Sequence, residues 1–509
     1  MSKTADNNKR IAKNTVLLYI RMFFIMAVTL YTSRVVLSTL GVTDFGIYNV
    51  VGGVVAMMGI LNGAMAVASQ RYLTFELGRD DTVRLKQVFS MCFTIFIILA
   101  IVIVLLCETV GLWFLNTQMV IPEERMSAAN WVYQFSVFSC VASLIVTPYN
   151  ATIIAHERMN VYAYVGMLEV VLKLVVVYLL LIIPADRLST YGFLILLSQV
   201  VVTATYIVYC LKHFPESRYK FYWEKPLFTE LVTYSGWNLF GSVSGLVKGQ
   251  GLNILLNMFF NPAVNAARGI AYQINAAITQ FFTNFYTAVR PQITKYYAQG
   301  DMGEMTKLVF RSSKLSFYLI MLVSMPIIIE TPYIVNLWLG QLPEYVVPFT
   351  RLIIAISAID SMASPLMTAA HATGHIRLYQ SSVGTMTILN IPVSYVFLRY
   401  GCSPLSVFYI SLFISIVCLF MRLWIVRRLM VFPVKEYIIK VFGSSLLVCA
   451  VALVIPLAAY MVLDENIYTV LIVCLLCIVS SIATIYYVGL SVHEREFVTS
   501  IIRKKFLHK

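Results

Sequence analysis

Two apolar segments near the middle of the chain, 228–258 and 264–288, each carry a positively charged side chain, Lys248 and Arg268 respectively. A cation at the depth of a lipid bilayer costs about 2.5–3.5 kcal/mol on insertion scales, so a segment that keeps one normally turns it toward protein or water. Amide and hydroxyl side chains accompany both cations. The two segments therefore predict a polar, cationic cavity rather than a lipid-facing surface.

Three further residues could contact a polar ligand in such a cavity. Asn253 and Asn275 lie in the same two segments. Arg21 follows Asn14 by seven residues in a predicted helix at about 14–38, so both lie on one helical face. Because Arg21 is only about two turns inside that helix, it either extends to the membrane interface or faces the cavity.

A predicted helix near residue 360 combines a carboxylate with a stripe of hydroxyl groups. The stripe has spacings of four, three, four and three residues and consists of Ser357, Ser361, Ser364, Thr368 and His371. We take Ser361 as its candidate substrate ligand. Asp360 lies about 100° around the helix from this neighbour. Since no cation is beside it in sequence, we expect a buried Asp360 that either pairs with Lys248 or Arg21 or binds a coupling ion.

A second charged pair is predicted inside a helix by Glu169 and Lys173, which are four residues apart in the favourable order. They either neutralise each other or handle a ligand or protons. We expect no cofactor and no metal site, because Cys474 and Cys477 lie in an apolar run without polar neighbours. The remaining cysteines predict no disulfide framework.

The composition indicates the class of protein that positions these residues. The 509 residues are 60% hydrophobic and 12% charged, and the mean hydropathy is +0.81. The apolar residues form fourteen runs of membrane-spanning length without the alternating polarity of barrel strands. The first run contains Arg21 and lacks a cleavage site, so we expect a retained helix rather than a signal peptide. An all-α membrane protein with about 14 transmembrane helices is predicted.

Positive charges are distributed unevenly between the two sides of the predicted membrane protein. With the N-terminus in the cytoplasm, 29 of the 38 Lys and Arg residues, Arg422 among them, fall on that side and five on the other. The positive-inside rule therefore predicts that both termini are cytoplasmic. This topology explains the net charge of +14 without a nucleic-acid partner.

An internal repeat predicts two lobes. Residues 79–90 and 300–311 match at Asp80/Asp301, Lys86/Lys307, Val88/Val309 and Phe89/Phe310. Each segment follows the second helix of a six-helix set, so the lobes are pseudo-symmetric with a cleft between them. The predicted divisions are an N-lobe of helices 1–6 at 1–212, a cytoplasmic linker at 213–227, a C-lobe of helices 7–12 at 228–428, and helices 13–14 with a basic tail at 429–509.

Three local patterns predict how helices pack. Gly241, Gly245 and Gly249 recur every four residues, as in a stripe that lets helices approach closely. The segment 70–89 is predicted to be an amphipathic connector whose cations, including Arg71, face lipid headgroups or water. The last two helices lie outside the repeat and form either a lipid-facing groove or an extra wall.

Several motifs carry a resemblance to a known family. The run RVVLSTLGVTDFGIYNVVGG at 34–53, SQRYLTFELGRD at 69–80, and Pro291 with YAQGD at 297–301 resemble Wzx-type polysaccharide flippases of the multidrug/oligosaccharidyl-lipid/polysaccharide exporter superfamily. The topology resembles that family over nearly the whole chain. Its fourteen helices, rather than twelve, look more like the related lipid II flippases.

This resemblance implies a V-shaped two-lobe fold that works by alternating access. It implies movement of an undecaprenyl-diphosphate-linked oligosaccharide from the inner to the outer leaflet of the bacterial cytoplasmic membrane, for O-antigen (lipopolysaccharide), capsule or exopolysaccharide assembly. Family members with anionic lipid-linked substrates place cations in the cavity, and Arg21, Lys248 and Arg268 match by helix position. The implied partners are the lipid-linked oligosaccharide, membrane lipids and other polysaccharide-assembly proteins.

The predicted cavity suits that substrate, because a diphosphate needs cations and sugars need amide and hydroxyl partners. We therefore expect a transporter and not an enzyme. An ion-coupled multidrug or cation antiporter is the alternative, but the intramembrane cations outnumber Glu169 and Asp360 and disfavour a cationic cargo. A membrane glycosyltransferase or polysaccharide polymerase would need a larger outer loop than 114–128 or 338–350 to carry catalytic carboxylates.

Overall fold

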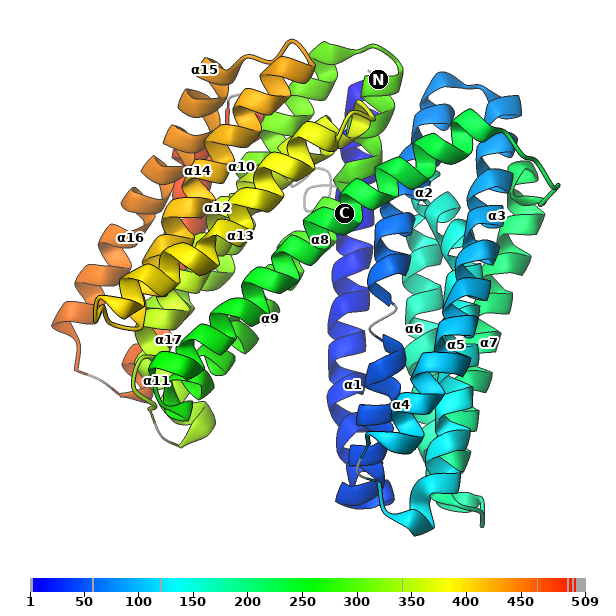
Figure 1. Ribbon diagram of the computed structural model, residues 1–509. Coiled ribbons are helices and arrows are strands. Elements are labelled where there is room, and N and C mark those ends of the chain that lie inside the picture. The colour runs from blue at the N-terminus through cyan, green and yellow to red at the C-terminus, as the bar shows by residue number, and fades with distance from the viewer. Residues whose placement is uncertain are drawn as a thin grey trace, which may run out of the picture. The chain divides into compact units, whose positions relative to one another are not determined.

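The computed structural model describes residues 3–56, 59–119, 121–340, 342–464, 466–491, 494–496 and 499. Within these ranges the chain is helical and has no strand (Figure 1). It divides into two compact units: unit 1 comprises Met1–Ser242 and Thr294–Asp301, and unit 2 comprises Val243–Ile293 and Met302–Lys509. Two long helices, α8 (Lys225–Phe259) and α9 (Pro262–Ala298), each begin in one unit and end in the other.

Besides the start of α8 and the end of α9, unit 1 contains α1 (Lys3–Ala56), α2 (Gly59–Arg79), α3 (Thr82–Leu106), η1 (Cys107–Gly111), α4 (Leu112–Thr117), α5 (Glu123–Ala155), α6 (Met159–Ile182), α7 (Arg187–His213) and η2 (Pro215–Ser217). These helices form a bundle in which α1 packs against α6, and α5 packs against α2 and α7. The path of α1 is broken at Gly41, whose φ of 76° and ψ of 169° are not helical. Glycine can adopt this conformation because it has no Cβ.

The segment 70–89 was predicted to expose Arg71 to lipid headgroups or water, and this prediction is wrong. Helix α2 continues to Arg79, and α3 begins after a turn at Asp80 and Asp81, where the Asp81 carboxylate accepts a hydrogen bond from the Arg84 amide (2.9 Å). Arg71 is only 7% exposed and its guanidinium lies over the Phe75 ring, 4.7 Å from its centre. Stacking on an aromatic ring offsets part of the cost of burying a guanidinium. The cluster of positive charges in the sequence does not show this contact.

The predicted linker at 213–227 lies in unit 1 and is attached along the bundle. Glu216 contacts His156 at the end of α5 (2.5 Å), and Arg84 of α3 contacts Glu224 (2.5 Å). Burial raises the pKa of Glu216, but the hydrogen bond with His156, a backbone hydrogen bond and the charges of His156 and Lys86 together outweigh burial and leave that pKa lowered. The hydrogen bond from Arg84 likewise lowers the pKa of Glu224. The start of α8 is thus attached to unit 1.

Unit 2 has two hydrophobic cores. Its other elements are α10 (Met302–Ile329), α11 (Thr331–Leu339), α12 (Val346–Ala372), α13 (Arg377–Arg399), α14 (Leu405–Leu429), α15 (Val434–Tyr437), η3 (Ile438–Gly443), α16 (Ser444–Val462), α17 (Ile467–Thr484) and η4 (Ile485–Gly489). One core, which includes Leu256, Ala267 and Phe349, joins α8 and α9 to α12. The other, which includes Met325 and Val473, attaches α16 and α17 to α10. The last two helices therefore belong to unit 2.

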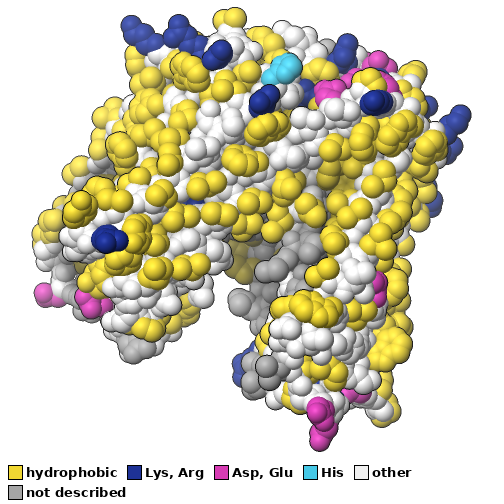
Figure 2. Space-filling view, viewed as in Figure 1, with side chains coloured by type: hydrophobic (Ala, Val, Ile, Leu, Met, Phe, Trp, Pro, Cys, Tyr) yellow, Lys and Arg dark blue, Asp and Glu magenta, His cyan; other side chains and the backbone are white. Residues whose placement is uncertain are grey.

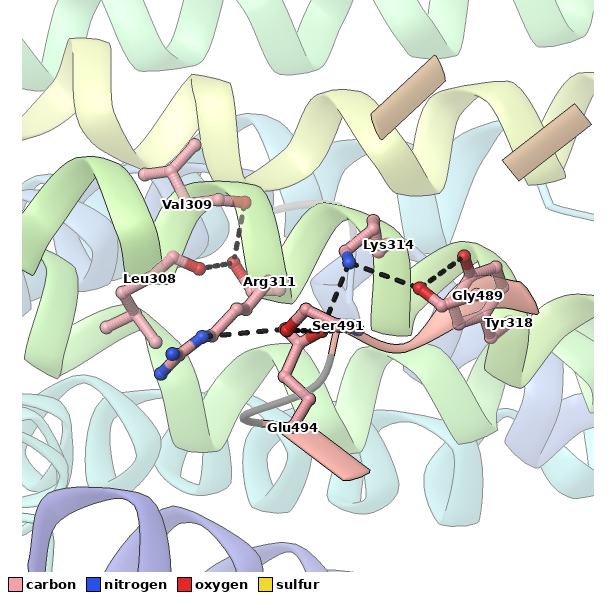
Figure 3. A network of polar contacts seen from close by, with 9 residues as sticks. Leu308, Val309, Arg311, Lys314, Tyr318, Gly489, Ser491 and Glu494 are labelled. Carbon is pink, nitrogen blue, oxygen red and sulfur yellow. Dashed lines mark hydrogen bonds and ion pairs between the residues drawn. The ribbon is translucent and has the colours of Figure 1, made fainter. Parts of the chain in front are cut away.

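The chain after η4 is attached to α10 by a polar network (Figure 3). The Lys314 ammonium contacts the Glu494 carboxylate (3.2 Å) and donates to the Gly489 carbonyl (3.3 Å), while Arg311 lies 3.5 Å from the same carboxylate. The Ser491 amide donates to Glu494 (2.8 Å). Burial raises the pKa of Glu494, but the Ser491 amide and the Lys314 charge outweigh it, so the pKa is lowered.

Eleven helices of the described ranges are long and apolar enough to cross a membrane. Of the fourteen predicted, the run centred near residue 56 passes through residues outside the described ranges, and α8 and α9 fall short because they are too polar. The visible surface of each unit is largely hydrophobic, with most Lys and Arg at the upper end (Figure 2). The chain is an all-α, multi-pass membrane protein, while the number fourteen stays a prediction.

The predicted close-packing glycine stripe is wrong for the two members that the structure tests. An added Cβ at Gly245 or Gly249 would meet no described atom within 4 Å. Close approach occurs instead at Gly251, where a Cβ would lie 2.4 Å from the Ile391 side chain of α13. The four-residue spacing of the glycines alone did not show which face of α8 contacts another helix.

Candidate functional site

Arg268 is held within the hairpin formed by α8 and α9. It donates hydrogen bonds to the Gly249 carbonyl (2.7 Å) and to the side-chain oxygen of Asn253 (3.1 Å), both on α8. Its guanidinium also lies 4.6 Å from the centre of the Tyr272 ring. These contacts fix a partly exposed cation beside the turn of α8 that carries Lys248, so the two predicted cations share one region of unit 2.

Lys248 is partly exposed and is not in any ion pair that the described residues form. The charges of Asp360 on α12 and Arg422 on α14 both act on it. One carboxylate and two cations from three helices therefore gather in unit 2. This arrangement leaves a net positive charge, which favours an anionic group over a cationic one.

Asp360 differs from its prediction in burial and in partner. Its side chain is 48% exposed, and its carboxylate lies 3.6 Å from the guanidinium of Arg422, which is 16% exposed. Ser415 of α14 donates to the same carboxylate (2.7 Å). The predicted pairing with Lys248 or Arg21 is therefore replaced by a pair with Arg422. The Nε atom of Arg422 is buried and has no hydrogen-bond partner among the described residues.

The hydroxyl stripe of α12 is used partly for packing. Tyr286 of α9 donates to the Ser364 carbonyl (2.9 Å) and shares a hydrogen bond with the Thr368 hydroxyl. Ser361 is fully buried, and its hydroxyl donates to the Ala358 carbonyl of its own helix (2.7 Å). In this conformation Ser361 is thus separate from the cations, and its role as a ligand stays a prediction.

Helix α9 exposes a polar face within unit 2. Asn275 is partly exposed, but its side-chain oxygen is buried and has no hydrogen-bond partner in the described part of the chain. The exposed residues of the same helix include Tyr272, Gln273, Gln280 and Thr283. Hydrocarbon offers no hydrogen bonds to the exposed Gln273 and Gln280 side chains, so this face requires water or a polar ligand.

Arg21 is bound inside unit 1. Its guanidinium lies over the Tyr162 ring of α6, 4.4 Å from the centre, and against the backbone at Gly166. A Cβ at residue 166 would lie 2.3 Å from the Arg21 Nε atom, so glycine leaves the space that the guanidinium fills. Arg21 thus contacts α6 within unit 1, and both predicted roles, at the interface or in the cavity, stay predictions.

Glu169 and Lys173 form an ion pair on α6, with 2.6 Å between the charged atoms. The Glu169 side chain is 35% exposed and the Lys173 side chain is 45% exposed. Exposed pairs of this kind contribute little to stability, so the pair leaves both groups accessible.

Lys248, Asn253, Arg268 and Asp360 all lie in unit 2, while Arg21, Glu169 and Lys173 lie in unit 1. Within unit 2, Arg268 contacts Asn253, and the charge of Asp360 acts on Lys248. Sequence reasoning missed Arg422, which was assigned to the cytoplasmic side. Its position inside the 405–429 helix, more than a turn before Arg427, is the signal that could have found it. The contribution of Tyr286 had no such signal, because its partners are about 80 residues away.

Comparison with known proteins identifies the fold. No protein-family model matches the chain, and no curated protein matches its sequence. A MATE solved in complex with MaD3S is 15% identical with a TM-score of 0.70 and covers 84% of this chain and 99% of its own. An outward-facing multidrug resistance MATE transporter of the MOP superfamily has the same identity and coverage, with a TM-score of 0.68.

The MATE transporter ClbM in complex with Rb⁺ gives 14% identity, a TM-score of 0.68, and coverage of 84% of this chain and 97% of that one. VcmN of Vibrio cholerae gives 13% identity, a TM-score of 0.63, and coverage of 86% and 99%. Identities this low show the fold alone. The chain therefore has the fold of these membrane transporters, while the predicted superfamily and family stay predictions.

Proposed function

We propose that this chain, which has the membrane-transporter fold of the MOP superfamily, flips an undecaprenyl-diphosphate-linked oligosaccharide from the inner to the outer leaflet of a bacterial cytoplasmic membrane by alternating access. Both termini would be cytoplasmic, and the product would feed O-antigen, capsule or exopolysaccharide assembly. The single observation that carries the proposal is the set of cations that α8, α9 and α14 hold within unit 2.

The cations suit a diphosphate. Arg268 uses two of its donors on Gly249 and Asn253, and a guanidinium has five, so further donors remain for phosphate oxygens. Lys248 supplies a second positive charge from the adjacent turn. Arg422 adds a third, partly neutralised by Asp360. Charge-assisted hydrogen bonds to phosphate are about twice as strong as neutral ones, which makes these residues the proposed head-group ligands.

The exposed face of α9 suits sugars. Gln273 and Gln280 are seven residues apart and therefore lie on the same side of the helix. Amides both donate and accept, as hydroxyl-rich rings require. The polyprenyl tail needs no polar partner and can remain in lipid while the head group passes along this face.

An ion-coupled multidrug antiporter is the second candidate, favoured by the likeness to a multidrug resistance MATE transporter. The half-exposed carboxylate of Asp360 could attract a cation. However, Lys248 and Arg422 both act on that region, so an organic cation would be repelled unless one of them moved. We therefore rank this candidate below the flippase.

The test compares Lys248→Ala with Arg399→Ala, which removes an exposed cation at the end of α13. Each variant is expressed in a deletion strain, and surface polysaccharide and lipid-linked intermediates are measured with protein level as control. We expect Lys248→Ala to lower display at least about tenfold and to accumulate the intermediate, as loss of roughly 1.4 kcal/mol or more would. Wild-type display with Lys248→Ala would contradict the proposal, as would drug export without any change in lipid-linked intermediates.

A further inference from the structure

The last turn of α9 belongs to unit 1 although most of that helix belongs to unit 2. In the described second half of the chain, unit 1 contains the segment Thr294–Asp301 and no other. The segment ends α9, turns at Gly300, whose φ is 73°, and leads directly into α10 of unit 2. Its attachment to unit 1 therefore restrains both α9 and α10 through the continuous chain.

A buried carboxylate holds this segment. Glu157, in the turn between α5 and α6, has a side chain that is 0% exposed, and it contacts Lys295 (2.6 Å) and Arg10 of α1 (2.8 Å). Asn14 donates to the Glu157 backbone carbonyl (3.3 Å). Glu157 also has a positive φ of 59°, which is uncommon for a residue other than glycine. The turn is thus shaped to present this carboxylate to the two cations.

A close steric fit holds the same segment independently of charge. A Cβ at Gly78, near the end of α2, would lie 2.7 Å from the Ala298 Cβ and 3.1 Å from the Lys295 Cα. Neither atom is the far end of a flexible side chain, so any larger residue at 78 must displace the segment. The Phe75 and Tyr297 rings also lie beside each other, with 6.3 Å between their centres.

The adjacent residue holds the other connection between the units. His156 contacts Glu216 (2.5 Å) and stacks on Phe214, with 4.1 Å between ring centres. These two residues belong to the segment that leads into α8. One short turn, His156 with Glu157, therefore attaches both the start of α8 and the end of α9, which are the two helices that continue into unit 2.

We propose that residues 294–301 form a latch that docks on the Glu157 carboxylate and Gly78 in one state of the transport cycle and leaves them in the other. A docked latch holds the last turn of α9 on unit 1. Its release frees α9 and α10 to move with unit 2. The proposal rests on alternating access in the proposed function, but it does not depend on which substrate is carried.

The ionic and steric contacts allow two independent perturbations. Glu157→Gln removes the charge that Lys295 and Arg10 share, and Gly78→Leu fills the space against Ala298 while leaving every charge in place. The matched controls are Glu304→Gln, which breaks an exposed pair with Lys307, and Gly236→Ala, where an added Cβ meets no described atom within 4 Å.

A third variant locks the latch. Gly78→Cys with Ala298→Cys brings two Cβ atoms close to the separation of about 3.5–4.5 Å that a disulfide needs, after a small outward shift. Oxidation should form a disulfide that reductant reverses. Ala298→Cys alone controls for the nine native cysteines, because Gly78→Cys by itself displaces the segment.

The readout is the distance distribution between spin labels at Gln118 in unit 1 and Leu337 in unit 2, both exposed, measured on full-length protein in lipid nanodiscs. We expect the disulfide to narrow the distribution to one population and reductant to restore it. Glu157→Gln and Gly78→Leu should shift the distance distribution the opposite way and raise hydrogen exchange at residues 294–301, with both controls unchanged.

A distance distribution unaffected by the disulfide and by Gly78→Leu would overturn the latch, as would lower thermal stability without any distance change. The outcome is independent of polysaccharide display, so it separates failure of the latch from failure of the flippase.

Discussion

The pair formed by Asp360 and Arg422 allows a quantitative test of the charge arrangement in unit 2. At the observed 3.6 Å, an effective dielectric of about 20 gives a gross attraction of roughly 4–5 kcal/mol, and water would give about 1 kcal/mol. Because the Asp360 side chain is 48% exposed, solvent screens the pair strongly. Desolvation of the largely buried Arg422 subtracts further. We therefore expect a net coupling of about 1–2 kcal/mol.

A double-mutant cycle measures this coupling. Asp360→Asn, Arg422→Gln and the double variant would be unfolded with denaturing detergent in mixed micelles, and the free energies compared. The Asp360→Asn and Lys248→Met cycle is the internal comparison. Lys248 forms no ion pair within 4 Å in the described structure, so its coupling should be less than about half as large.

The same pair predicts a functional rescue. Asp360→Arg should impair transport because it places three cations together, and the exchange Asp360→Arg with Arg422→Asp should restore part of the activity measured by polysaccharide display. Additive free energies, within about 0.3 kcal/mol, would refute the pairing. Rescue by Lys248→Asp instead of Arg422→Asp would show that the functional partner is the one that the sequence suggested.

Three further predictions concern other parts of the molecule. Gly166→Ala should displace the Arg21 guanidinium from α6 but lower thermal stability only modestly, because the displaced atoms end a flexible side chain; an unchanged signal from a probe at Tyr162 would argue against the contact. Because the pKa of Glu494 is lowered, its attachment should persist above the ordinary glutamate pKa of about 4.3 and be lost as pH falls below it. A spin label at Val488 should become mobile over that range, and Glu494→Gln should be mobile at every pH. Cysteines at Glu123 and Arg218, both exposed, should react with impermeant reagent from opposite sides of the membrane, and labelling from one side would overturn the topology.

Much of the helical organisation could be predicted from hydrophobic run length. The runs at 405–429 and 467–484, for example, correspond to helices α14 and α17, because a segment that crosses lipid must satisfy its backbone internally. The polar character of α8 and α9 was also readable from Lys248 and Arg268. The structure adds how Arg268 is held, through a backbone carbonyl and an amide one helix away.

The residues that sequence reasoning misplaced share a physical cause. Arg71 and Arg422 each lie near other cations in sequence, which suggested solvent-exposed clusters. Arg71 lies over the ring of Phe75, one helical turn later, and Arg422 pairs with Asp360, a carboxylate of another helix that faces it only after folding. The sequence predicts no role for Glu157, because charged residues are common in short turns. Nothing local shows that Arg10 and Lys295, which are 285 positions apart, meet at its carboxylate.

The polarity of α8 and α9 and their division between the units have a common explanation. Both helices fall short of the eleven apolar spans, and both begin in one unit and end in the other. Under the proposed alternating access, a helix shared between two moving units cannot be enclosed by either one, so part of its surface remains free. On α9 that free surface carries Gln273, Gln280 and Thr283, for which hydrocarbon offers no hydrogen bonds. Water or a hydroxylated substrate must therefore supply them, and this requirement makes α9 the helix along which a sugar head group is expected to travel.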